Sequence, residues 1–300
     1  MSVVVAVVGP TATGKSDLGV ALARALGGEV VNADAMQLYR GMDVGTAKLP
    51  LPERQGVPHH LLDVLEVRDE ASVEAYQRQA RAALDDISSR GGVPVLVGGS
   101  GLYVGAALDR LEIPPTDPVL RADLEEQAAT AGAAAMHQRL AAADPASAQR
   151  IGPGNVRRVV RALEVIELTG RPFAASLPAP EHLRPTVTLA LDAPRPVLAD
   201  RVQARVHRMW AQGLLAEAAA LDAAGLREGR TASRALGYAQ ALAQLDGELT
   251  REQAQDETAR LTRRLARRQR AWFGRDPRVT WLPHDAPDLL ARALGVLDGR

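Results

Sequence analysis

Cysteine is absent from the 300-residue sequence, and this absence excludes several kinds of chemistry. Without cysteine the chain cannot form disulfides, cysteine-ligated zinc sites or iron–sulfur clusters, and it cannot use a thiol in catalysis. No apolar run reaches the roughly 18 residues that a membrane-spanning helix needs. The apolar run 3–8 follows Met1 without the basic segment of a signal peptide. We therefore expect a soluble, cytoplasmic protein that does not bind membranes.

Lysine is nearly absent as well, because only Lys15 and Lys48 accompany 34 arginines. Basic and acidic residues number 36 each, so the formal net charge is zero. That zero conceals a split: residues 1–150 contain 13 basic and 19 acidic side chains, and residues 151–300 contain 23 and 17, giving net charges of −6 and +6. Such asymmetry between halves indicates a polyanionic partner.

Apolar strand patterns alternate with helical patterns along most of the chain. The β-branched run 3–8 is typical of a parallel strand that is buried on both faces. We expect further strands at 29–31, 93–97, 186–191 and 279–282. Helices are predicted at 16–26, 73–87, 194–224 and 251–273. This alternation predicts an α/β fold with a mainly parallel sheet.

Residues 114–185 have a different character. They begin and end in proline-rich segments, and between these they are rich in alanine with helical periodicity and no strand candidate. We predict an all-helical insertion at 116–182 in a core formed by residues 1–115 and 183–300.

The segment after the first strand matches the phosphate-loop pattern G-x-x-x-x-G-K-[ST]. Its residues are Gly9, Pro10, Thr11, Ala12, Thr13, Gly14, Lys15 and Ser16. A strand precedes it and a helix follows it, so its backbone N–H groups are expected to surround an anion, with Lys15 on the phosphates and Ser16 on Mg²⁺. The strand at 93–97 ends in glycines rather than in the acidic residue of nucleotide hydrolases. This difference favours a loop that binds a diphosphate.

Asp34 directly follows the second expected strand. Because the carboxyl ends of parallel strands line the ligand crevice, Asp34 is expected beside the phosphate loop. Two interpretations remain open: a general base or metal-orienting group, or the N-cap of a short helix. Lys48, further along the same loop, would by itself be a solvated surface charge.

Six segments in order make the sequence similar to a known family. They are GPTATGKS (9–16), DAMQLYRGMDVGTAK (34–48), PHHLLDV (58–64), LVGGSGLYVGAAL (96–108), NVRRVVRALEV (155–165) and RRLARRQRAWF (263–273). Together they closely resemble the bacterial tRNA dimethylallyltransferases, also called tRNA isopentenyltransferases. The resemblance covers nearly the whole chain, and it implies a P-loop NTPase-like core whose helical insertion clasps tRNA.

The resemblance also implies a reaction. Members of the family transfer a dimethylallyl group from dimethylallyl diphosphate to N6 of the adenosine immediately 3′ of the anticodon (adenosine-37), giving i6A and releasing diphosphate. Their tRNAs read codons that begin with U, and the partner is the anticodon stem-loop. Mg²⁺ is the implied cofactor, and we further expect a monomer.

The family resemblance assigns roles to particular residues. Asp34 is the implied proton acceptor, and Lys15, Ser16, Thr11 and Arg205 are the other implied catalytic residues, with Arg201 and Arg208 as competitors for the place of Arg205. Residues 9–16 bind the diphosphate. The implied tRNA-binding residues are Asp34, Ala35, Met36, Gln37, Ser100, Arg121, Arg157, Arg158, Val159, Val160, Arg161, Ser233, Arg234, Arg263, Arg264, Arg267, Arg268 and Gln269. Lys48 is placed near the nucleic acid. The sequence departs from the family at Ala35, where serine is usual, and at Ser100, where threonine is usual.

Arginine patterns support an RNA partner independently of the resemblance. Between residues 258 and 278, eight arginines face one aspartate, a net charge of +7. Helical spacing gathers several of them on one face, which suits RNA backbone binding. A solvated face remains the alternative for the smaller cluster at 157–161, and Trp272 and Phe273 could stack on bases or belong to a core.

Three other functions are considered. A P-loop kinase would consume ATP without tRNA, an isopentenyltransferase of free adenine nucleotides would not need the insertion, and a non-catalytic RNA-binding module would not use Asp34. Zinc at His59 and His60 is not expected, because adjacent histidines in an extended chain point apart and no matching ligands lie nearby.

Overall fold

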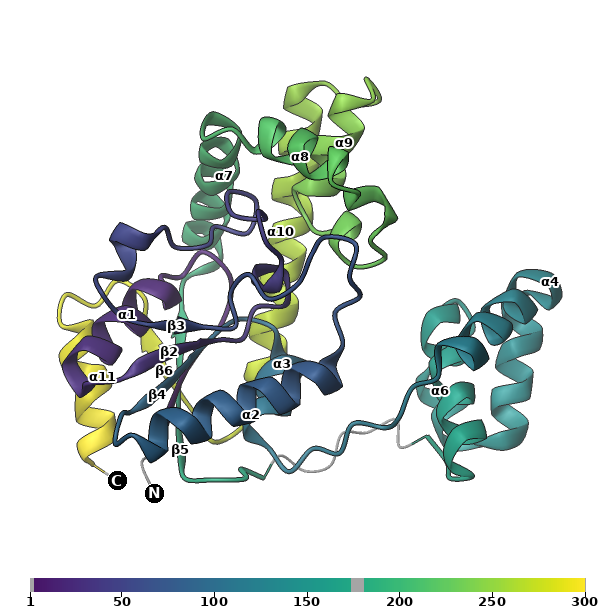
Figure 1. Ribbon diagram of the computed structural model, residues 1–300, viewed down its shortest axis with the longest axis horizontal. Helices are drawn as coiled ribbons and strands as arrows, with labels where there is room; N and C mark the ends of the chain where they lie inside the picture. Colours follow the sequence, from purple (N-terminus) through teal and green to yellow (C-terminus); the bar gives the residue numbers. More distant parts are fainter. Residues whose placement is uncertain (1–2, 174–180, 300) are drawn as a thin grey trace. The chain divides into compact units, whose positions relative to one another are not determined.

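The computed structural model describes residues 3–173 and 181–299, which belong to two compact units (Figure 1). The first unit comprises residues 1–110 and 181–300, and the second comprises residues 111–180. The boundaries predicted from the sequence, 115/116 and 182/183, differ from these by a few residues. The two segments of the first unit that lead into and out of the second unit are joined to each other. Asp109 and His182 form a β-bridge, and the amide of Arg110 donates to Glu181 O at 2.8 Å.

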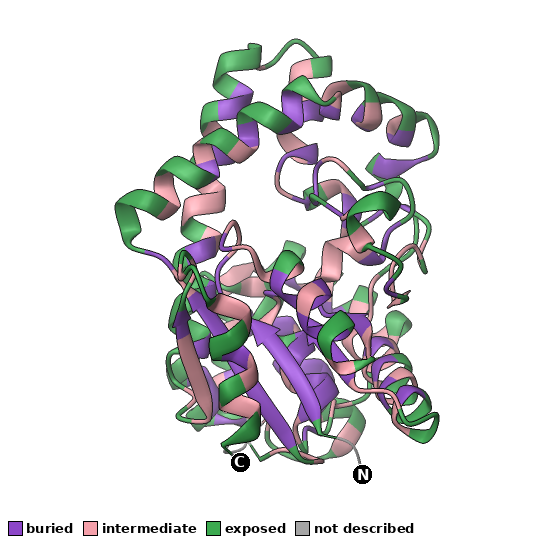
Figure 2. Ribbon diagram, turned by 90° about the vertical axis from the view of Figure 1, so that its left-hand side faces the viewer, coloured by how far each residue is buried: buried purple, intermediate pink, exposed green. Residues whose placement is uncertain are grey.

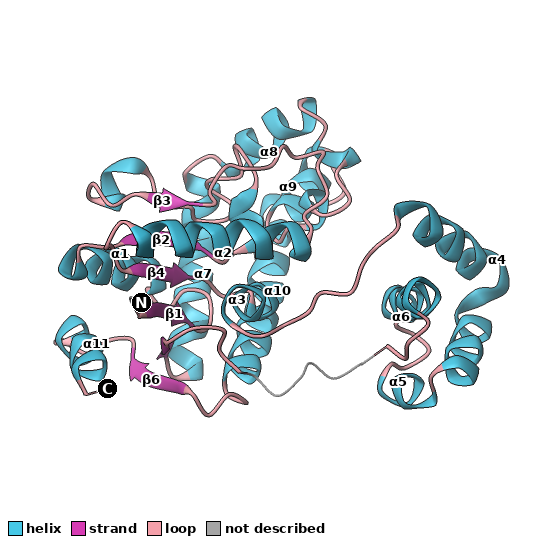
Figure 3. Cartoon of the chain, turned by 60° about the horizontal axis from the view of Figure 1, so that its bottom comes forward, coloured by secondary structure: helices cyan, strands magenta, loops and turns pink. Residues whose placement is uncertain are grey.

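A six-stranded sheet lies in the first unit, in the order β3-β2-β4-β1-β5-β6 with every neighbouring pair parallel (Figure 3). The strands are β1 (Val4–Val8), β2 (Glu29–Asn32), β3 (His59–His60), β4 (Pro94–Val97), β5 (Thr186–Asp192) and β6 (Val279–Pro283). The predicted α/β fold with a parallel sheet is confirmed. The sequence did not predict β3, because two residues are too short to show periodicity.

Helices pack on the sheet. α1 (Lys15–Leu26) and α11 (Leu289–Asp298) pack on one face, where alternate strand residues such as Val5, Val7 and Leu189 form an apolar core. α2 (Val73–Ser89) also contacts the sheet, and through its Tyr76 hydroxyl it donates to Asn32 O at 2.9 Å. α3 (Gly101–Leu108) packs against α2. In Figure 2 the strands are mostly buried, as the continuous apolar strand patterns predict.

A second helical layer follows β5. It consists of α7 (Arg195–Ala211), α8 (Leu214–Ala223), α9 (Tyr238–Leu245) and α10 (Arg251–Phe273). The prediction of one helix over 194–224 is wrong, since Gly213 adopts φ +98° between α7 and α8, a conformation that suits glycine and ends the helix. Trp210 and Tyr238 fill the core of this layer together with Tyr39 and Met42 from the loop after β2. The loop after β2 is therefore packed against the helices that follow β5.

The second unit has its own small core. Its helices are α4 (Pro118–Ala143), α5 (Pro145–Arg150) and α6 (Val156–Thr169). Gly132 interrupts α4 with φ +84°. Leu124, Met136, Leu140 and Leu163 are among the buried residues that α4 and α6 contribute to this core.

Candidate active site

The turn between β1 and α1 has the backbone of an anion-binding loop. Gly9 and Gly14 adopt φ of +121° and +91°, which other residues rarely do. A Cβ on Gly9 would lie only 2.7 Å from Leu191 O of β5, so this position also needs glycine for space. The first amides of α1 follow Gly14 and have no acceptor within the helix. These amides and the helix dipole can receive a phosphate group.

Two side chains of the loop bind its own backbone. Lys15 Nζ donates to Pro10 O at 2.6 Å, and Thr13 Oγ1 donates to the same carbonyl at 2.9 Å. Thr13 is 1% exposed, so its side chain stabilises the loop from within, and a contact of Thr13 with a diphosphate would be made by its backbone amide. Burial lowers the pKa of Lys15 to about 8, with Arg205 acting in the same direction and Asp34 opposing it. Burial and Arg205 destabilise the protonated form of Lys15, and a bound anion would stabilise it.

Arg205 of α7 connects the phosphate loop to the loop after β2. Its guanidinium donates to Thr11 Oγ1 and to Thr46 O, both at 3.1 Å. Arg201 is exposed and donates to a phosphate-loop carbonyl at 2.7 Å, while Arg208 is exposed and lines the wider cavity. Arg205 alone of these three also lines the inner cavity, so the structure places it closest to the centre of the site.

Asp34 caps a short helix and also faces the site. Its Oδ1 accepts from Met36 N at 3.0 Å, which makes it the N-cap of the 3₁₀ turn at Ala35–Leu38. The same residue lines the inner cavity with Lys15 and Ser16. The two interpretations of Asp34 are therefore compatible, because the cap engages one carboxylate oxygen and still leaves the group beside the phosphate loop.

Asn32, at the end of β2, holds the backbone of Asp34 from both sides. Its Oδ1 accepts from Asp34 N at 2.9 Å, and its Nδ2 donates to Asp34 O at 3.0 Å and to Leu61 O at 2.9 Å. The Ser100 hydroxyl accepts from the next amide, Ala35 N, at 3.3 Å. Ser100 therefore supports the loop that carries Asp34, a role that the hydroxyl of the family's usual threonine could also fill.

Lys48 is a buried structural cation. Its side chain is 3% exposed, and its ammonium donates to Tyr39 O at 2.9 Å and to Asp43 and Asp63 carboxylates at 2.6 Å each. The interpretation of Lys48 as a solvated surface charge is therefore wrong. The ammonium fixes the loop after β2 to the segment before Val64, and Gln37 adds a bond to Thr46 O at 3.2 Å.

Glu217 of α8 fixes the other side of this loop. Its carboxylate accepts from Val44 N at 2.9 Å, from Gly45 N at 3.2 Å and from the hydroxyl of Tyr238. A Cβ on Gly45 would lie 2.4 Å from the Tyr238 ring, so only glycine fits here. Glu217 could not be predicted from the sequence, because one acidic residue in an alanine-rich helix forms no pattern.

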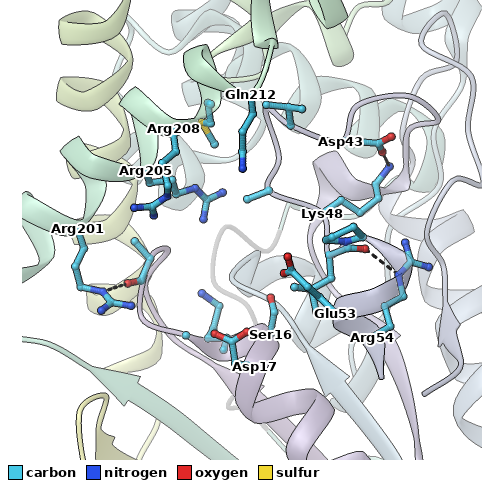
Figure 4. Close-up of a pocket in the computed structure, with 18 of the residues that line it drawn as sticks. Ser16, Asp17, Asp43, Lys48, Glu53, Arg54, Arg201, Arg205, Arg208 and Gln212 are labelled. Atoms are coloured by element: carbon cyan, nitrogen blue, oxygen red, sulfur yellow. Dashed lines mark hydrogen bonds and ion pairs between the residues drawn. The ribbon is translucent and has the colours of Figure 1, made fainter. Parts of the chain in front are cut away.

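Two neighbouring cavities meet at the phosphate loop. The inner one, of about 70 Å³, is lined by Asp34, Lys15, Ser16 and Arg205 together with apolar groups such as Val97. The wider one, of about 820 Å³, shares Lys15, Ser16 and Arg205. Figure 4 shows Arg201, Arg205 and Arg208 on one side of the wider cavity, Asp43 and Glu53 on the opposite side, and Asp17 beside Ser16 between them. Lys15, Ser16 and Arg205 therefore lie between the wide, open cavity and the small, partly apolar inner cavity.

The exposed basic face of α10 is smaller than the sequence suggested. Arg260 pairs with Glu257, Arg270 with Asp192, and Arg278, beyond the helix, with Asp276 and Asp109. Arg263 is half-buried and donates to Gln203 of α7 at 3.2 Å. In the middle of α10 three neighbouring exposed arginines, Arg264, Arg267 and Arg268, have no acidic partner among the described residues, and the same is true of Arg251 at its start and of Arg275 beyond its end. The three neighbouring arginines stay candidates for an RNA contact.

Gln269 was predicted to bind tRNA, but its side chain is buried. It is 9% exposed, and its amide binds Thr11 N at 2.9 Å and Gly99 O at 3.0 Å, so its side chain does not face an RNA. Elsewhere in this unit Ser233 donates to Gly229 O at 2.6 Å, whereas Arg234 is exposed. Trp272 is partly exposed and Phe273 is buried, so only Trp272 could stack on a base.

Of the residues in the second unit that were predicted to contact RNA, some are exposed and others are part of its core. Arg157 and Arg158 are exposed. Val159 and Val160 are buried in the core of the unit, which corrects the prediction for their side chains.

Arg121 and Arg161 pair with a buried carboxylate in the second unit. Both donate to Glu164, which is fully buried, and Thr116 donates to it as well. Burial has the largest effect on the pKa of Glu164 and raises it, but these hydrogen bonds outweigh burial and lower the pKa to about 2. The two arginines are therefore structural partners of Glu164 in this conformation.

Potential metal ligands do not cluster in the described part of the chain. No group of three or more His, Asp or Glu side chains that could hold a metal ion occurs in residues 3–173 and 181–299. His59 is half-buried, and burial lowers its pKa while its Nδ1 lies 2.9 Å from Val57 O. Over the same described ranges, no helix is both long and apolar enough to cross a membrane.

Comparison with known proteins gives one consistent result. The sequence profile of the IPP transferase family matches residues 37–276. The chain is 63% identical to the tRNA dimethylallyltransferase of Kineococcus radiotolerans, over 98% of this chain and 96% of that protein. It is 61% identical to the protein of the same name from Thermobifida fusca, over 99% and 95% of the two chains.

Solved structures show the same relationship. The tRNA isopentenylpyrophosphate transferase of Bacillus halodurans is 39% identical with a TM-score of 0.73, over 100% of this chain and 96% of that chain. A eukaryotic dimethylallyltransferase described as acting on tRNA is 25% identical with a TM-score of 0.82, over 99% of this chain and 78% of that chain.

Proposed function

Since this chain belongs to the IPP transferase family, we propose that it transfers a dimethylallyl group from dimethylallyl diphosphate to tRNA. The proposed acceptor is N6 of the adenosine immediately 3′ of the anticodon, in tRNAs that read codons beginning with U. One observation supports this proposal most strongly: a single small cavity brings Asp34 beside Lys15, Ser16 and Arg205. A proton acceptor and a diphosphate site are what an alkylation of an amine by an allylic diphosphate requires.

The proposed step forms one bond and breaks another. The adenine N6 attacks C1 of the dimethylallyl group, the C1–O bond breaks, and its electron pair leaves with the diphosphate. The proton released from N6 passes to the Asp34 carboxylate. Because the N6 lone pair is delocalised into the purine ring, the amine is a weak nucleophile, and positioning must supply much of the acceleration. Asn32 supplies such positioning, since it holds the backbone of Asp34 on both sides.

Charge on the departing diphosphate would be stabilised by the phosphate loop. Lys15 and Arg205 are the two cations that line both cavities and border the loop. They lie where negative charge develops, and the amides at the start of α1 add further donors. In this proposal Thr11 helps to place Arg205, through the bond of 3.1 Å between them.

Mg²⁺ is the proposed cofactor, and Ser16 would hold it. The Ser16 hydroxyl lines both cavities and has no hydrogen-bond partner in the described part of the chain. Mg²⁺ often binds through one or two protein groups, phosphate oxygens and water, so the lack of a carboxylate cluster is compatible with it. When bound, the ion would neutralise charge on the diphosphate.

The tRNA is proposed to contact exposed arginines of each unit. In the first unit these are Arg264, Arg267 and Arg268 on α10, and in the second they are Arg157 and Arg158 on α6. Arginine binds phosphate in a fork geometry and supplies affinity that falls with salt. The target base must also leave the stack of the anticodon loop to reach the cavity.

A transfer assay tests the proposal and separates the alternatives. The protein is incubated with labelled dimethylallyl diphosphate, Mg²⁺ and tRNA that lacks the modification, and the tRNA is digested to nucleosides. We expect labelled prenyl adenosine at the position 3′ of the anticodon. In parallel reactions with ATP or AMP in place of tRNA, ATP consumption would indicate a kinase, and transfer of the label to AMP would indicate an enzyme of free nucleotides. Binding of tRNA without transfer would indicate a non-catalytic module.

Asp34→Asn tests the proton acceptor. Asparagine keeps an oxygen that can accept from Met36 N, so the cap is retained while the base is removed. We expect the transfer rate to fall about 10²–10⁴-fold, the usual contribution of a general base, with tRNA affinity nearly unchanged. Asp200→Asn is the matched control, because Asp200 is exposed on α7 and lines neither cavity. A large loss of tRNA affinity in Asp34→Asn would show that Asp34 is mainly an RNA contact.

A further inference from the structure

One buried amide links α10 to the phosphate loop. Gln269 lies one residue beyond Arg268 on α10, yet it points inward while Arg268 is exposed. Its Oε1 accepts from Thr11 N at 2.9 Å, and its Nε2 donates to Gly99 O at 3.0 Å. Both polar ends of the side chain are therefore satisfied, by two loops that line the inner cavity.

The bond to Thr11 determines which way one peptide group faces. The peptide between Pro10 and Thr11 is planar and trans, so its N–H and its C=O point in opposite directions. Gln269 holds the N–H end. The C=O end accepts from Lys15 Nζ at 2.6 Å and from Thr13 Oγ1 at 2.9 Å. A rotation of this peptide would move the acceptor of the Lys15 ammonium away from it.

The side-chain amide of Gln269 fits closely against Gly99. A Cβ on Gly99 would lie 2.3 Å from Gln269 Nε2, so the amide fits only because residue 99 is glycine. The same helix is fixed at its end by Arg270, which pairs with Asp192 at the end of β5. The position of Gln269 relative to the phosphate loop is thus held from two directions.

We propose that Gln269 is a positioning residue for the diphosphate site: it orients the Pro10–Thr11 peptide so that Lys15 is held ready for the donor. It acts through the loop and touches neither substrate. Because Gln269 lies on the helix whose exposed arginines are the proposed tRNA contacts, it also joins the RNA-binding helix to the donor site. This inference rests on the proposed function for the identity of the donor, but the loop geometry can be tested without it.

Gln269→Met is the direct test, because methionine has a similar length and no hydrogen-bonding amide. Loss of a buried hydrogen bond predicts that inorganic diphosphate with Mg²⁺ binds about 10-fold more weakly in a calorimetric titration. In the transfer assay the KM for dimethylallyl diphosphate should rise by a similar factor with kcat nearly unchanged, the signature of lost ground-state binding. Affinity for tRNA should stay within about twofold.

Arg268→Met is the matched control, since it makes a similar change one residue away on the exposed side. It should weaken tRNA binding and leave the affinity for diphosphate unchanged. The opposite pattern, with Gln269→Met weakening tRNA and sparing diphosphate, would overturn the proposal and restore Gln269 as an RNA contact. A lower kcat with unchanged KM in Gln269→Met would also overturn it, because fewer correctly folded molecules give that result.

Gly99→Ala perturbs the same contact from the other side and serves if Gln269→Met does not fold. We expect it to weaken diphosphate binding, and we expect its effect to be smaller in a Gln269→Met background, since the two changes act on one interaction. Full additivity would contradict the proposal. If the wild-type protein transfers no dimethylallyl group, the proposed function fails, but the diphosphate titrations still decide the role of Gln269.

Discussion

Replacing Lys48 with methionine removes a buried ammonium from the loop after β2 and tests whether this lysine is structural. The ammonium has three acceptors, Tyr39 O and the carboxylates of Asp43 and Asp63. Methionine can occupy the same space without any of the three bonds. The consequences differ between the acceptors, because Tyr39 is fully buried whereas the Asp43 and Asp63 side chains are 57% and 41% exposed.

The size of the effect follows from that difference. Water can replace the ammonium at the two exposed carboxylates, so each lost pair costs at most about 1 kcal/mol. The carbonyl of Tyr39 has no access to water, and a buried acceptor without a partner costs about 1–3 kcal/mol. Together these effects predict a loss of about 1–5 kcal/mol in the free energy of unfolding. For a domain of this size the melting temperature should fall by about 2–20 °C.

Thermal unfolding followed by circular dichroism measures this loss, and fluorescence anisotropy measures tRNA binding below the transition. Arg40→Met is the matched control, because Arg40 is an exposed partner of Glu66 and should cost less than about 1 kcal/mol. We expect Lys48→Met to melt earlier and to bind tRNA with an affinity within about twofold of the wild type while folded. An unchanged melting temperature together with weaker tRNA binding would refute the structural role and make Lys48 a nucleic-acid contact.

Three further predictions concern other charged groups. Because the pKa of Lys15 is lowered to about 8 and its protonated form binds anions, diphosphate affinity measured by calorimetry should fall as the pH rises through about 8; an affinity that does not fall there would contradict this. Glu164→Gln leaves Arg121 without its buried counter-charge and should cost the second unit about 3 kcal/mol, seen as faster amide hydrogen exchange in α4 and α6, whereas unchanged protection would refute the buried ion pair. Replacing Arg267 and Arg268 together by glutamine should reduce the slope of log tRNA affinity against log salt by about 2, and an unchanged slope would move the RNA path elsewhere.

The fold could be predicted because its strands are continuous apolar runs. The strands that form there, β1, β4 and β5, are buried on both faces of the sheet, so the hydrophobicity of each residue indicates a buried environment. α10 was predicted over the residues it occupies, since its long amphipathic period is visible in the sequence. The break at Gly213 was missed, because a single glycine within an apolar helical pattern does not reveal whether the chain continues or turns.

The candidate site could be predicted only where a residue acts through its own type and local spacing. Lys15 and Ser16 follow from the phosphate-loop pattern, and Asp34 from its place after a strand. Glu217 and Asn32 could not be recognised in this way. Their roles arise from hydrogen bonds to backbone groups, and in the case of Glu217 those groups lie more than 170 positions away in the sequence. Any polar residue can bind a backbone amide, so no sequence pattern marks the one that does.

The glycines at the end of β4 show how packing around the site limits its chemistry. Nucleotide hydrolases with a phosphate loop place an acidic residue after such a strand. Here a Cβ on Gly98 would lie 2.2 Å from Ala33 O, and a Cβ on Gly99 would lie 2.3 Å from the amide of Gln269. The first space is taken by the backbone that leads to Asp34, and the second by the side chain that orients the phosphate loop. No carboxylate could enter at either position without displacing one of these supports, so the same close packing that positions Asp34 and Lys15 also excludes the acidic residue of a nucleotide hydrolase.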